Sequence, residues 1–192
     1  MNTAPTDTVP IAVLDVDGTL VDSNYQHALA WYRAFRSLGE TFPIWRIHRR
    51  IGMGGDQLVA ALGGDELEAR IGDQVRERWV QEADPLMAEV ALLPGARELI
   101  VALTERGHRV VLASSGKPHH VERSLDLLDV RGIVDGWTTS EDVERTKPAP
   151  DLLHAALEKI GEPADAPSVV VGGSVYDTPA DLTVALDQTP LA

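Results

Sequence analysis

An apolar run at residues 9–14 stops abruptly at two carboxylates, Asp15 and Asp17, which are followed by Gly18 and Thr19. The run is short, rich in β-branched residues and apolar on both faces, which is typical of a central strand in a parallel sheet that helices cover. In such sheets ligands sit beyond the carboxyl ends of the strands. The pattern therefore predicts a buried strand that ends at Asp15, with the following acids placed where chemistry takes place.

The two carboxylates are two residues apart at the strand end, so they point in roughly the same direction. Held close together, they repel one another and shift each other's pKa unless a cation lies between them. Gly18 lets the chain turn sharply, and Thr19 adds a hydroxyl and a backbone N–H. The sequence thus predicts a turn that presents two acids to a ligand. A plain acidic turn at the end of a strand is the alternative.

The rest of the chain divides into a helical stretch and an alternating stretch. Residues 22–88 carry apolar residues at helical spacing and no convincing strand, and helices are expected at 22–36, 43–51, 56–62 and 65–83. Farther along, strands alternate with helices, which favours a parallel sheet. The expected strands are 108–114, 133–138 and 168–171, and the expected helices are 95–106, 118–129 and 148–160. We therefore expect an α/β fold with a Rossmann-like core formed by 1–21 and 89–192 and a helical unit inserted at 22–88.

The composition narrows the range of partners. The 192 residues include 17 basic and 30 acidic side chains, which gives a formal net charge of −13. An acidic surface argues against nucleic acid and anionic membranes, so an anionic substrate has to be bound by local positive groups or by a metal. The absence of cysteine excludes disulfides and thiolate metal sites. Because no apolar segment reaches about 18 residues and the first residues do not resemble a signal peptide, we expect a cytoplasmic protein. The oligomeric state is left open.

Polar groups also follow the other predicted strands. They are the segment Ser114-Ser115-Gly116, then Lys147, and then Asp177. The carboxyl ends of parallel strands meet at one edge of a sheet, so we expect these groups to join the two acids of the first strand in one site. Lys117 also follows a strand and competes with Lys147 for the role of the local cation.

The segment Asp15-Val16-Asp17-Gly18-Thr19-Leu20 resembles the first signature of the haloacid dehalogenase superfamily, most of whose members are phosphohydrolases. The resemblance extends over residues 9–182 and implies a parallel sheet core with an inserted α-helical cap, which closes over the active site and selects the substrate. It implies that Asp15 attacks phosphorus and forms an aspartyl-phosphate, while Asp17 protonates the leaving oxygen and later activates water. An acid at the second position points to phosphoryl chemistry, because dehalogenase members usually lack it.

Two further motifs fit the same resemblance. Ser114 looks like the second motif, a hydroxyl that holds a phosphoryl oxygen with help from the N–H groups of Ser115 and Gly116. Lys147, in the context Arg-Thr-Lys-Pro-Ala-Pro, resembles the third motif, in which an ammonium balances the charge on the nucleophile and the phosphoryl group. This context favours Lys147 over Lys117. A helix cap at Ser114 and a solvated Lys147 are the alternatives.

The fourth motif departs from the family pattern. Residues 169–177 resemble a strand followed by Gly-Asp-Ser-x-x-x-Asp, but Gly173 stands where the family has an acid that ligates magnesium. The resemblance implies a Mg²⁺ cofactor held by Asp15, Asp17 and Asp177, with water filling the remaining positions. Because Mg²⁺ requires oxygen ligands in strict octahedral geometry, we expect the missing carboxylate to weaken metal binding and turnover. A position of Asp177 away from the metal is the alternative.

Other residues are assigned to substrate contacts or to the core. The substrate-binding residues that we expect are Gly18, Thr19, Arg49, Ser115 and Gly116. Arg49 and Arg50 belong to the densest basic run in the chain and precede the loop at 52–56, although a solvated helix face is the alternative for both. We expect His119 and His120 to be exposed at a helix start, and Trp31 and Tyr32 to lie in the core of the helical unit.

These features favour a Mg²⁺-dependent phosphatase that hydrolyses a small phosphate monoester, such as a sugar phosphate or a phosphoglycolate-like compound. A sugar-phosphate mutase would use the same groups. A second hypothesis is a catalytically impaired relative that binds a phosphorylated ligand or a protein partner. It is motivated by Gly173 and by the short segment at 182–192. From this short segment we also expect an open sheet edge, with reduced stability or self-association. Dehalogenase activity is the least favoured hypothesis.

Overall fold

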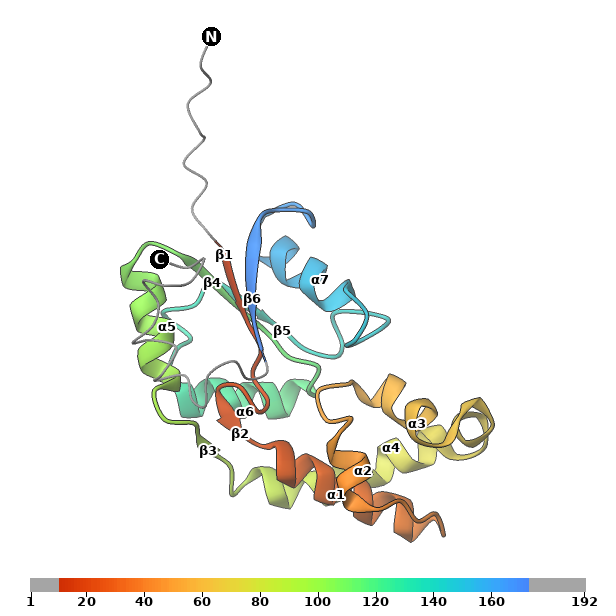
Figure 1. Cartoon of the computed structure of the whole chain (residues 1–192). Helices are drawn as coiled ribbons and strands as arrows, with labels where there is room; N and C mark the ends of the chain where they lie inside the picture. Colours follow the sequence, from red (N-terminus) through yellow and green to blue (C-terminus); the bar gives the residue numbers. More distant parts are fainter. Residues whose placement is uncertain (1–10, 173–192) are drawn as a thin grey trace.

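The computed structural model describes residues 11–172, and this part of the chain contains six strands and seven helices (Figure 1). The strands are β1 (Ile11–Leu14), β2 (Val21–Asp22), β3 (Ala91–Leu92), β4 (Arg109–Ala113), β5 (Gly136–Thr138) and β6 (Ser168–Val171). The helices are α1 (Asn24–Ser37), α2 (Ile44–His48), α3 (Gly55–Gly63), α4 (Asp65–Met87), α5 (Ala96–Glu105), α6 (Pro118–Leu128) and α7 (Asp151–Lys159). The expectations for Gly173, Asp177 and residues 182–192 lie outside the described residues.

Four strands form a parallel sheet in the order β5-β4-β1-β6, which confirms the predicted α/β class. β1 lies inside the sheet, where Ile11 pairs with Arg109 of β4 on one side and with Ser168 of β6 on the other. All four residues of β1 are buried, as expected of a strand that has neighbours on both sides and helices on both faces. The carboxyl end of β1, and hence Asp15, therefore lies at the middle of the sheet edge.

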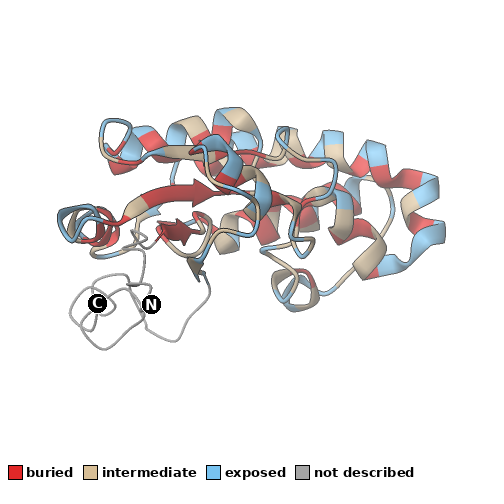
Figure 2. Cartoon of the chain, turned by 90° about the horizontal axis from the view of Figure 1, so that it is seen from above, coloured by how far each residue is buried: buried red, intermediate tan, exposed pale blue. Residues whose placement is uncertain are grey.

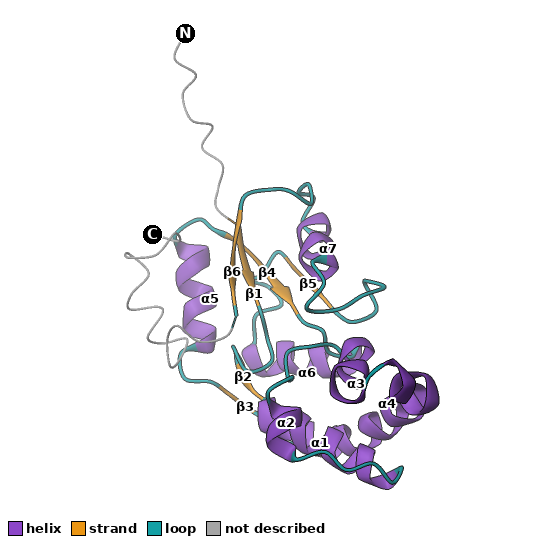
Figure 3. Cartoon of the chain, turned by 45° about the vertical axis from the view of Figure 1, so that its right-hand side comes forward, coloured by secondary structure: helices purple, strands orange, loops and turns teal. Residues whose placement is uncertain are grey.

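Alternate residues of the central strands pack into two different cores. Ala12 and Leu14 join the core beneath α5 and α6, whereas Ile11 and Val13 join the core beneath α7. This follows from the strand geometry, in which successive side chains point to opposite faces. Figure 3 shows α5 and α7 on opposite sides of the sheet. The sheet unit therefore has three layers, with the sheet between α5 and α6 on one face and α7 on the other. Both faces of the central strands are covered by apolar side chains, so polar groups are found at the strand ends.

Helices α1–α4 build a separate hydrophobic core beyond the carboxyl ends of the strands (Figures 1 and 2). In α1 the buried residues Ala28, Trp31 and Phe35 recur at helical spacing, and α4 contributes Val75 and Trp79 to the same core. Both Trp31 and Tyr32 contact this core, as the spacing predicted. The helical unit therefore holds together through its own apolar contacts while facing the sheet edge.

The connection between the two units contains a short antiparallel pair that the sequence did not predict. β2 pairs with β3, and Leu93 N donates a hydrogen bond to Leu20 O at 3.0 Å. A strand of two residues is too short to show alternation, so this pair becomes visible only when the departing and returning chain segments lie side by side. It fixes the helical unit to the sheet at the point where the chain leaves and returns.

Most predicted elements are present with shifted ends. α4 continues to Met87, past the expected end at 83 and through Pro85, and α7 begins at Asp151 rather than at 148. Within residues 11–172, none of the helices combines the length and the apolar character needed to cross a membrane.

Candidate active site

A cavity of about 190 Å³ lies between the carboxyl edge of the sheet and the helical unit. The sheet unit lines it with Asp15, Asp17, Ser115, Gly116, Lys117, Ser140, Glu144, Thr146 and Lys147. The helical unit lines it with His27, Trp31, Arg76, Trp79 and residues 51–56, which are a loop followed by the start of α3. The cavity therefore brings together side chains that the sequence placed at strand ends, namely Asp15, Asp17, Ser115 and Lys147. Both units form its walls.

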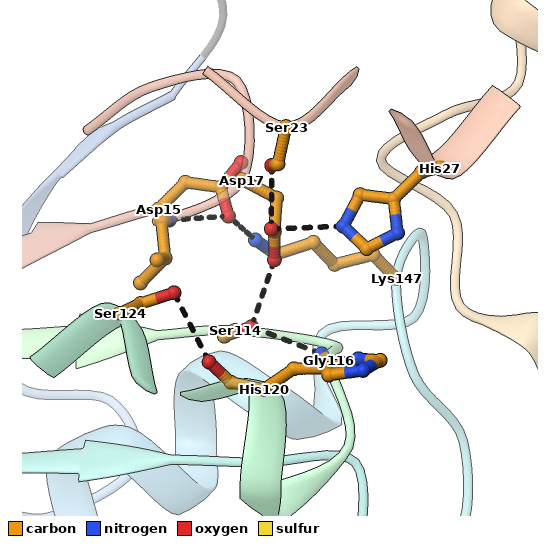
Figure 4. A network of polar contacts seen from close by, with 10 residues as sticks. Asp15, Asp17, Ser23, His27, Ser114, Gly116, His120, Ser124 and Lys147 are labelled. Carbon is orange, nitrogen blue, oxygen red and sulfur yellow. Dashed lines mark hydrogen bonds and ion pairs between the residues drawn. The ribbon is translucent and has the colours of Figure 1, made fainter. Parts of the chain in front are cut away.

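Asp15 directly follows β1, and one of its two carboxylate oxygens is engaged by neighbouring groups. Its Oδ1 accepts a hydrogen bond from Val16 N at 2.9 Å and contacts Lys147 Nζ, which also donates to Ala113 O at 2.9 Å (Figure 4). Burial raises the pKa of the Asp15 carboxyl, while the Lys147 ammonium opposes this rise. Since these contacts engage Oδ1, the arrangement leaves Oδ2 as the oxygen that can approach a substrate.

Asp17 is surrounded by hydrogen-bonding side chains. Ser23 Oγ donates to Asp17 Oδ1 at 2.7 Å, His27 Nε2 lies 3.0 Å from the same oxygen, and Ser114 Oγ donates to Oδ2 at 3.1 Å (Figure 4). Burial alone would raise the pKa of Asp17, but the nearby His27 and the hydrogen bonds from His27, Ser23 and Ser114 outweigh it and hold the pKa well below its usual range. Asp17 is thus an anion whose orientation is set by three partners.

In the described part of the chain, the segments after β4 and β5 each bring an unpaired hydroxyl to the cavity. Ser114 is fully buried and does not line the cavity. Its hydroxyl accepts a hydrogen bond from Gly116 N at 2.9 Å and donates one to Asp17, so Ser114 orients Asp17. Within residues 11–172, the buried Ser115 Oγ and Ser140 Oγ have no hydrogen-bond partner, and both residues line the cavity. Buried hydroxyls without a partner cost free energy, so a polar ligand that pairs with them is favoured.

The helical unit is hydrogen-bonded directly to the segment that carries Lys147. Asp56 accepts hydrogen bonds from Thr146 N at 3.1 Å and from the Thr146 hydroxyl, and Gly54 N donates to Lys147 O at 3.1 Å. A Cβ on Gly54 would lie only 1.5 Å from Thr146 Oγ1, so the approach requires glycine at this position. We call Gly54, Asp56 and Thr146 the latch.

Aromatic side chains form the wall of the cavity on the helical side. The rings of His27 and Trp79 stack with centroids 5.6 Å apart, and those of Trp79 and Trp31 stack at 5.3 Å. Arg76 adds a guanidinium, which is tied to Gly55 O and to Glu68. The sequence analysis did not identify His27, Trp79 or Arg76. His27 lies on the same helix face as the buried apolar residues of α1. A histidine on an otherwise apolar helix face was the sequence signal that could have identified it.

Some residues assigned to substrate contacts lie elsewhere. Gly18 and Thr19 form the turn after β1, where Gly18 has φ of 70° and donates its N–H to Val21 O, and neither residue lines the cavity. The guanidinium of Arg49 lies over the Trp45 ring, 5.1 Å from its centroid, also outside the cavity lining. Arg50 donates to Ala61 O at 2.9 Å within the helical unit. Gly18 and Thr19 therefore belong to the turn after β1, and Arg49 and Arg50 contact other parts of the helical unit.

The histidine pair after β4 differs from the sequence expectation. His119 is exposed as predicted, but the prediction was wrong for His120, whose ring is buried. α6 packs its first turn against the end of α4, and Asp84 of α4 lies within hydrogen-bond distance of both imidazoles. The contact partner comes from a segment far away in the sequence, which local periodicity does not reveal.

The donor set at the end of β1 fits a hard divalent cation. Asp15 and Asp17 supply carboxylate and backbone oxygens, the ligands that Mg²⁺ binds together with several waters. Two buried carboxylates side by side also favour a nearby positive charge. The residue after β6 reaches this point as well, because a Cβ added to Gly172 would lie 3.0 Å from Asp15 Cβ.

Comparison with known proteins gives consistent results. A family model described as haloacid dehalogenase-like hydrolase matches residues 9–180. The chain is 28% identical to the validoxylamine A 7'-phosphate phosphatase of Streptomyces hygroscopicus subsp. limoneus over 157 residues, which cover 81% of this chain and 74% of that protein. It is 30% identical to hexitol phosphatase B of Escherichia coli (strain K12) over 158 residues, which cover 78% of this chain and 69% of that enzyme.

A similar solved structure is that of a hydrolase from Pseudomonas syringae, with a TM-score of 0.81 and 28% identity; the match covers 94% of this chain and 99% of that one. The similarity therefore includes the sheet, the helical unit and the strand ends between them. On these grounds the chain belongs to the haloacid dehalogenase-like hydrolase family, and it is an enzyme of that class.

Proposed function

We propose that this enzyme is a Mg²⁺-dependent phosphatase that hydrolyses a small phosphate monoester through an aspartyl-phosphate on Asp15. The observation that carries the proposal is the position of Asp15, whose Oδ1 is held by Lys147 Nζ and Val16 N at the bottom of a cavity lined by both units. A carboxylate held on one oxygen presents the other to a substrate in a fixed direction, which is the requirement for nucleophilic catalysis.

In the first step Asp15 Oδ2 attacks phosphorus, the bond between phosphorus and the ester oxygen breaks, and the leaving oxygen takes a proton from Asp17. Because Asp17 is ionised in the substrate-free protein, it has to take up this proton from solvent when the negatively charged phosphoryl group binds beside it. In the second step Asp17 accepts a proton from a water molecule, whose oxygen attacks the phosphorus of the aspartyl-phosphate. The bond between phosphorus and Asp15 Oδ2 then breaks, which releases inorganic phosphate and restores the Asp15 carboxylate. His27 Nε2, at 3.0 Å from Asp17 Oδ1, is placed to orient Asp17 for both proton transfers. Lys147 offsets the negative charge that gathers at Asp15.

The metal site follows from the same residues. Asp15 and Asp17 are the described residues that would hold Mg²⁺, and Asp177 is a third candidate from the sequence. A bound Mg²⁺ supplies positive charge next to the phosphoryl oxygens. Ser115 and Ser140, whose hydroxyls lack partners within the described residues, are available to hydrogen-bond those oxygens.

We propose that residues 22–88 act as a cap and that the substrate is a small polyol phosphate or sugar phosphate. The relatives named as phosphatases act on a validoxylamine 7'-phosphate and on hexitol phosphates, as their names state. A cavity of about 190 Å³ is small for a drug-sized ligand and fits a compact metabolite. The stacked rings of His27, Trp79 and Trp31 offer an apolar wall against the carbon skeleton of such a substrate.

The test is hydrolysis of p-nitrophenyl phosphate in excess Mg²⁺, followed by a screen of phosphorylated sugars and sugar alcohols. We expect phosphate release by the parent, none by Asp15→Asn, and unchanged release by the matched control Asp65→Asn, because Asp65 is exposed in the first turn of α4. Equal activity of Asp15→Asn and the parent would refute the proposal. Conversion of a sugar phosphate into an isomer without phosphate release would identify a mutase instead.

A further inference from the structure

Three potential metal ligands converge at a place outside the cavity described above. His119 Nε2 and His120 Nε2 lie 3.0 Å and 2.9 Å from Asp84 Oδ1, and the three ligand atoms all lie within 4.8 Å of one another. Asp84 belongs to the last turns of α4, whereas the two histidines belong to the first turn of α6. None of the three residues lines the cavity at the strand ends.

We propose that Asp84, His119 and His120 form a binding site for Zn²⁺ or a similar first-row transition-metal ion. In a tetrahedral zinc site with metal–ligand bonds of about 2.0–2.1 Å, the ligand atoms lie about 3.3 Å apart. The two N···O separations of 2.9 and 3.0 Å are close to this value, so widening them by a few tenths of an ångström makes room for the ion. Water completes the coordination, because His119 and Asp84 are about half exposed.

The chemistry of the three groups selects the kind of metal. Two imidazole nitrogens and one carboxylate oxygen suit zinc, copper and nickel, whereas Mg²⁺ prefers oxygen ligands alone. Burial, with the nearby His119 and His27, lowers the pKa of His120, which keeps its ring neutral and able to bind a metal. Without a metal, the hydrogen bonds with the two imidazoles keep the pKa of Asp84 below its usual value despite the effect of burial, so the carboxylate is ionised. A bound metal ion would replace these hydrogen bonds, with each imidazole carrying its proton on Nδ1.

The surroundings hold the ligands in place. The His120 ring packs edge-on against Trp79 at a centroid distance of 5.7 Å and lies 4.1 Å from the His119 ring. Arg123 Nη2 donates to Ala88 O at 2.9 Å, which is a second contact between α6 and the segment after α4. The metal would therefore connect the helical unit to the sheet unit, and binding to the folded state alone would raise the melting temperature.

The test measures Zn²⁺ binding by competition with a chromophoric chelator, on untagged full-length protein in excess Mg²⁺. We expect one saturable site in the parent, with an affinity at least about tenfold lower in His119→Gln and in Asp84→Asn. Both altered residues are exposed, so folding is retained, and circular dichroism verifies this. Zn²⁺ should also raise the melting temperature of the parent more than that of either variant.

Two controls separate this site from other sources of binding. His154 is exposed on α7, which packs on the opposite face of the sheet from α6, and His154→Gln should bind Zn²⁺ as the parent does. Asp15→Asn should also retain binding, whatever its phosphatase activity. The proposal is overturned if the parent shows no saturable binding, if His119→Gln and Asp84→Asn bind as tightly as the parent, or if Asp15→Asn abolishes binding.

Discussion

Asp17 illustrates how single residues at this site depend on their neighbours. Its carboxylate is ionised because the nearby His27 and the hydrogen bonds from His27, Ser23 and Ser114 more than offset the effect of burial. The Ser23 hydroxyl lies at the N-cap of α1 but makes no capping hydrogen bond there; it donates to Asp17 instead. Ser23, whose type and position before α1 predict a helix cap, thus orients the Asp17 carboxylate instead.

This environment predicts a pH dependence of stability. Because the pKa of Asp17 is lowered in the folded protein, ionised Asp17 stabilises the fold above its unfolded pKa of about 3.9, and this stabilisation is lost as the pH falls through the folded pKa. The difference in unfolding free energy between the parent and Asp17→Asn should therefore shrink below about pH 4. Urea denaturation at a series of values between about pH 3 and about pH 7 measures this difference.

His27 provides the control for this prediction. In a His27→Ala background the strongest influence that lowers the pKa of Asp17 is gone, so the pH-dependent part of the difference should become smaller. A difference that keeps its full pH dependence without His27 would contradict the assignment of His27 as the main partner of Asp17.

Lys147 is the ammonium that the structure brings to Asp15, although Lys117 lines the same cavity. Replacing Lys147 with Met removes the charge that faces Asp15 and the developing phosphoryl charge. We expect kcat to fall by about 100- to 1000-fold, measured with p-nitrophenyl phosphate. Lys117→Met should cost less, and the control Lys159→Met, at an ion pair with Asp142 on the surface, should have little effect. A larger loss in Lys117→Met than in Lys147→Met would reverse the assignment.

At the scale of elements, the sequence predicted the helices and long strands well, because their periodicity is local. α1 and α5 were recognisable from apolar residues on one helix face, and β1 from a run that is buried on both faces. The pair β2 and β3 was missed because two residues show no period, and the end of α4 was misplaced because packing carries the helix through Pro85. Contacts between distant segments decide such features.

The latch is the element-scale feature with a direct consequence for activity. Asp56 of α3 holds Thr146, whose neighbour Lys147 contacts Asp15, so docking of the helical unit and positioning of the ammonium are coupled. Asp56→Ala removes hydrogen bonds to a charged group that are worth about 1.5–3 kcal/mol each. We expect kcat/KM for p-nitrophenyl phosphate to fall by at least about tenfold.

Two variants make this prediction specific. Thr146→Val keeps the backbone N–H but removes the hydroxyl, so it should show a smaller loss of kcat/KM than Asp56→Ala. Asp65→Ala removes an exposed acid from α4 and should leave kcat/KM unchanged. If Asp56→Ala behaves like Asp65→Ala, the latch does not contribute to turnover.

At the scale of the whole molecule, the net charge of −13 requires that an anionic substrate be bound by local groups and a cation. The sequence lacks a carboxylate at Gly173, which follows Gly172, the last described residue, and Gly172 lies against Asp15. Gly173→Asp should therefore lower the Mg²⁺ concentration needed for half-maximal activity and raise kcat, because it adds a hard oxygen ligand. Titration of p-nitrophenyl phosphate hydrolysis with Mg²⁺ measures both.

Gly132→Asp is the matched control, since Gly132 is exposed, an added Cβ would meet nothing within 4 Å, and the variant adds the same charge. An equal change in Gly132→Asp would attribute the effect to net charge. A parent without turnover that becomes active in Gly173→Asp would favour the catalytically impaired relative that the sequence left as an alternative.

The sequence alone determined the α/β class, the buried strand that ends in Asp15, the family, and the group of polar residues at the strand ends. These properties depend on spacing along the chain, and spacing can be read without coordinates. Only the tertiary structure placed His27 beside Asp17, Asp56 on Thr146, and Asp84 between two histidines. Each of these contacts joins the helical unit to the sheet unit, so it depends on how the inserted helices pack against the strand ends.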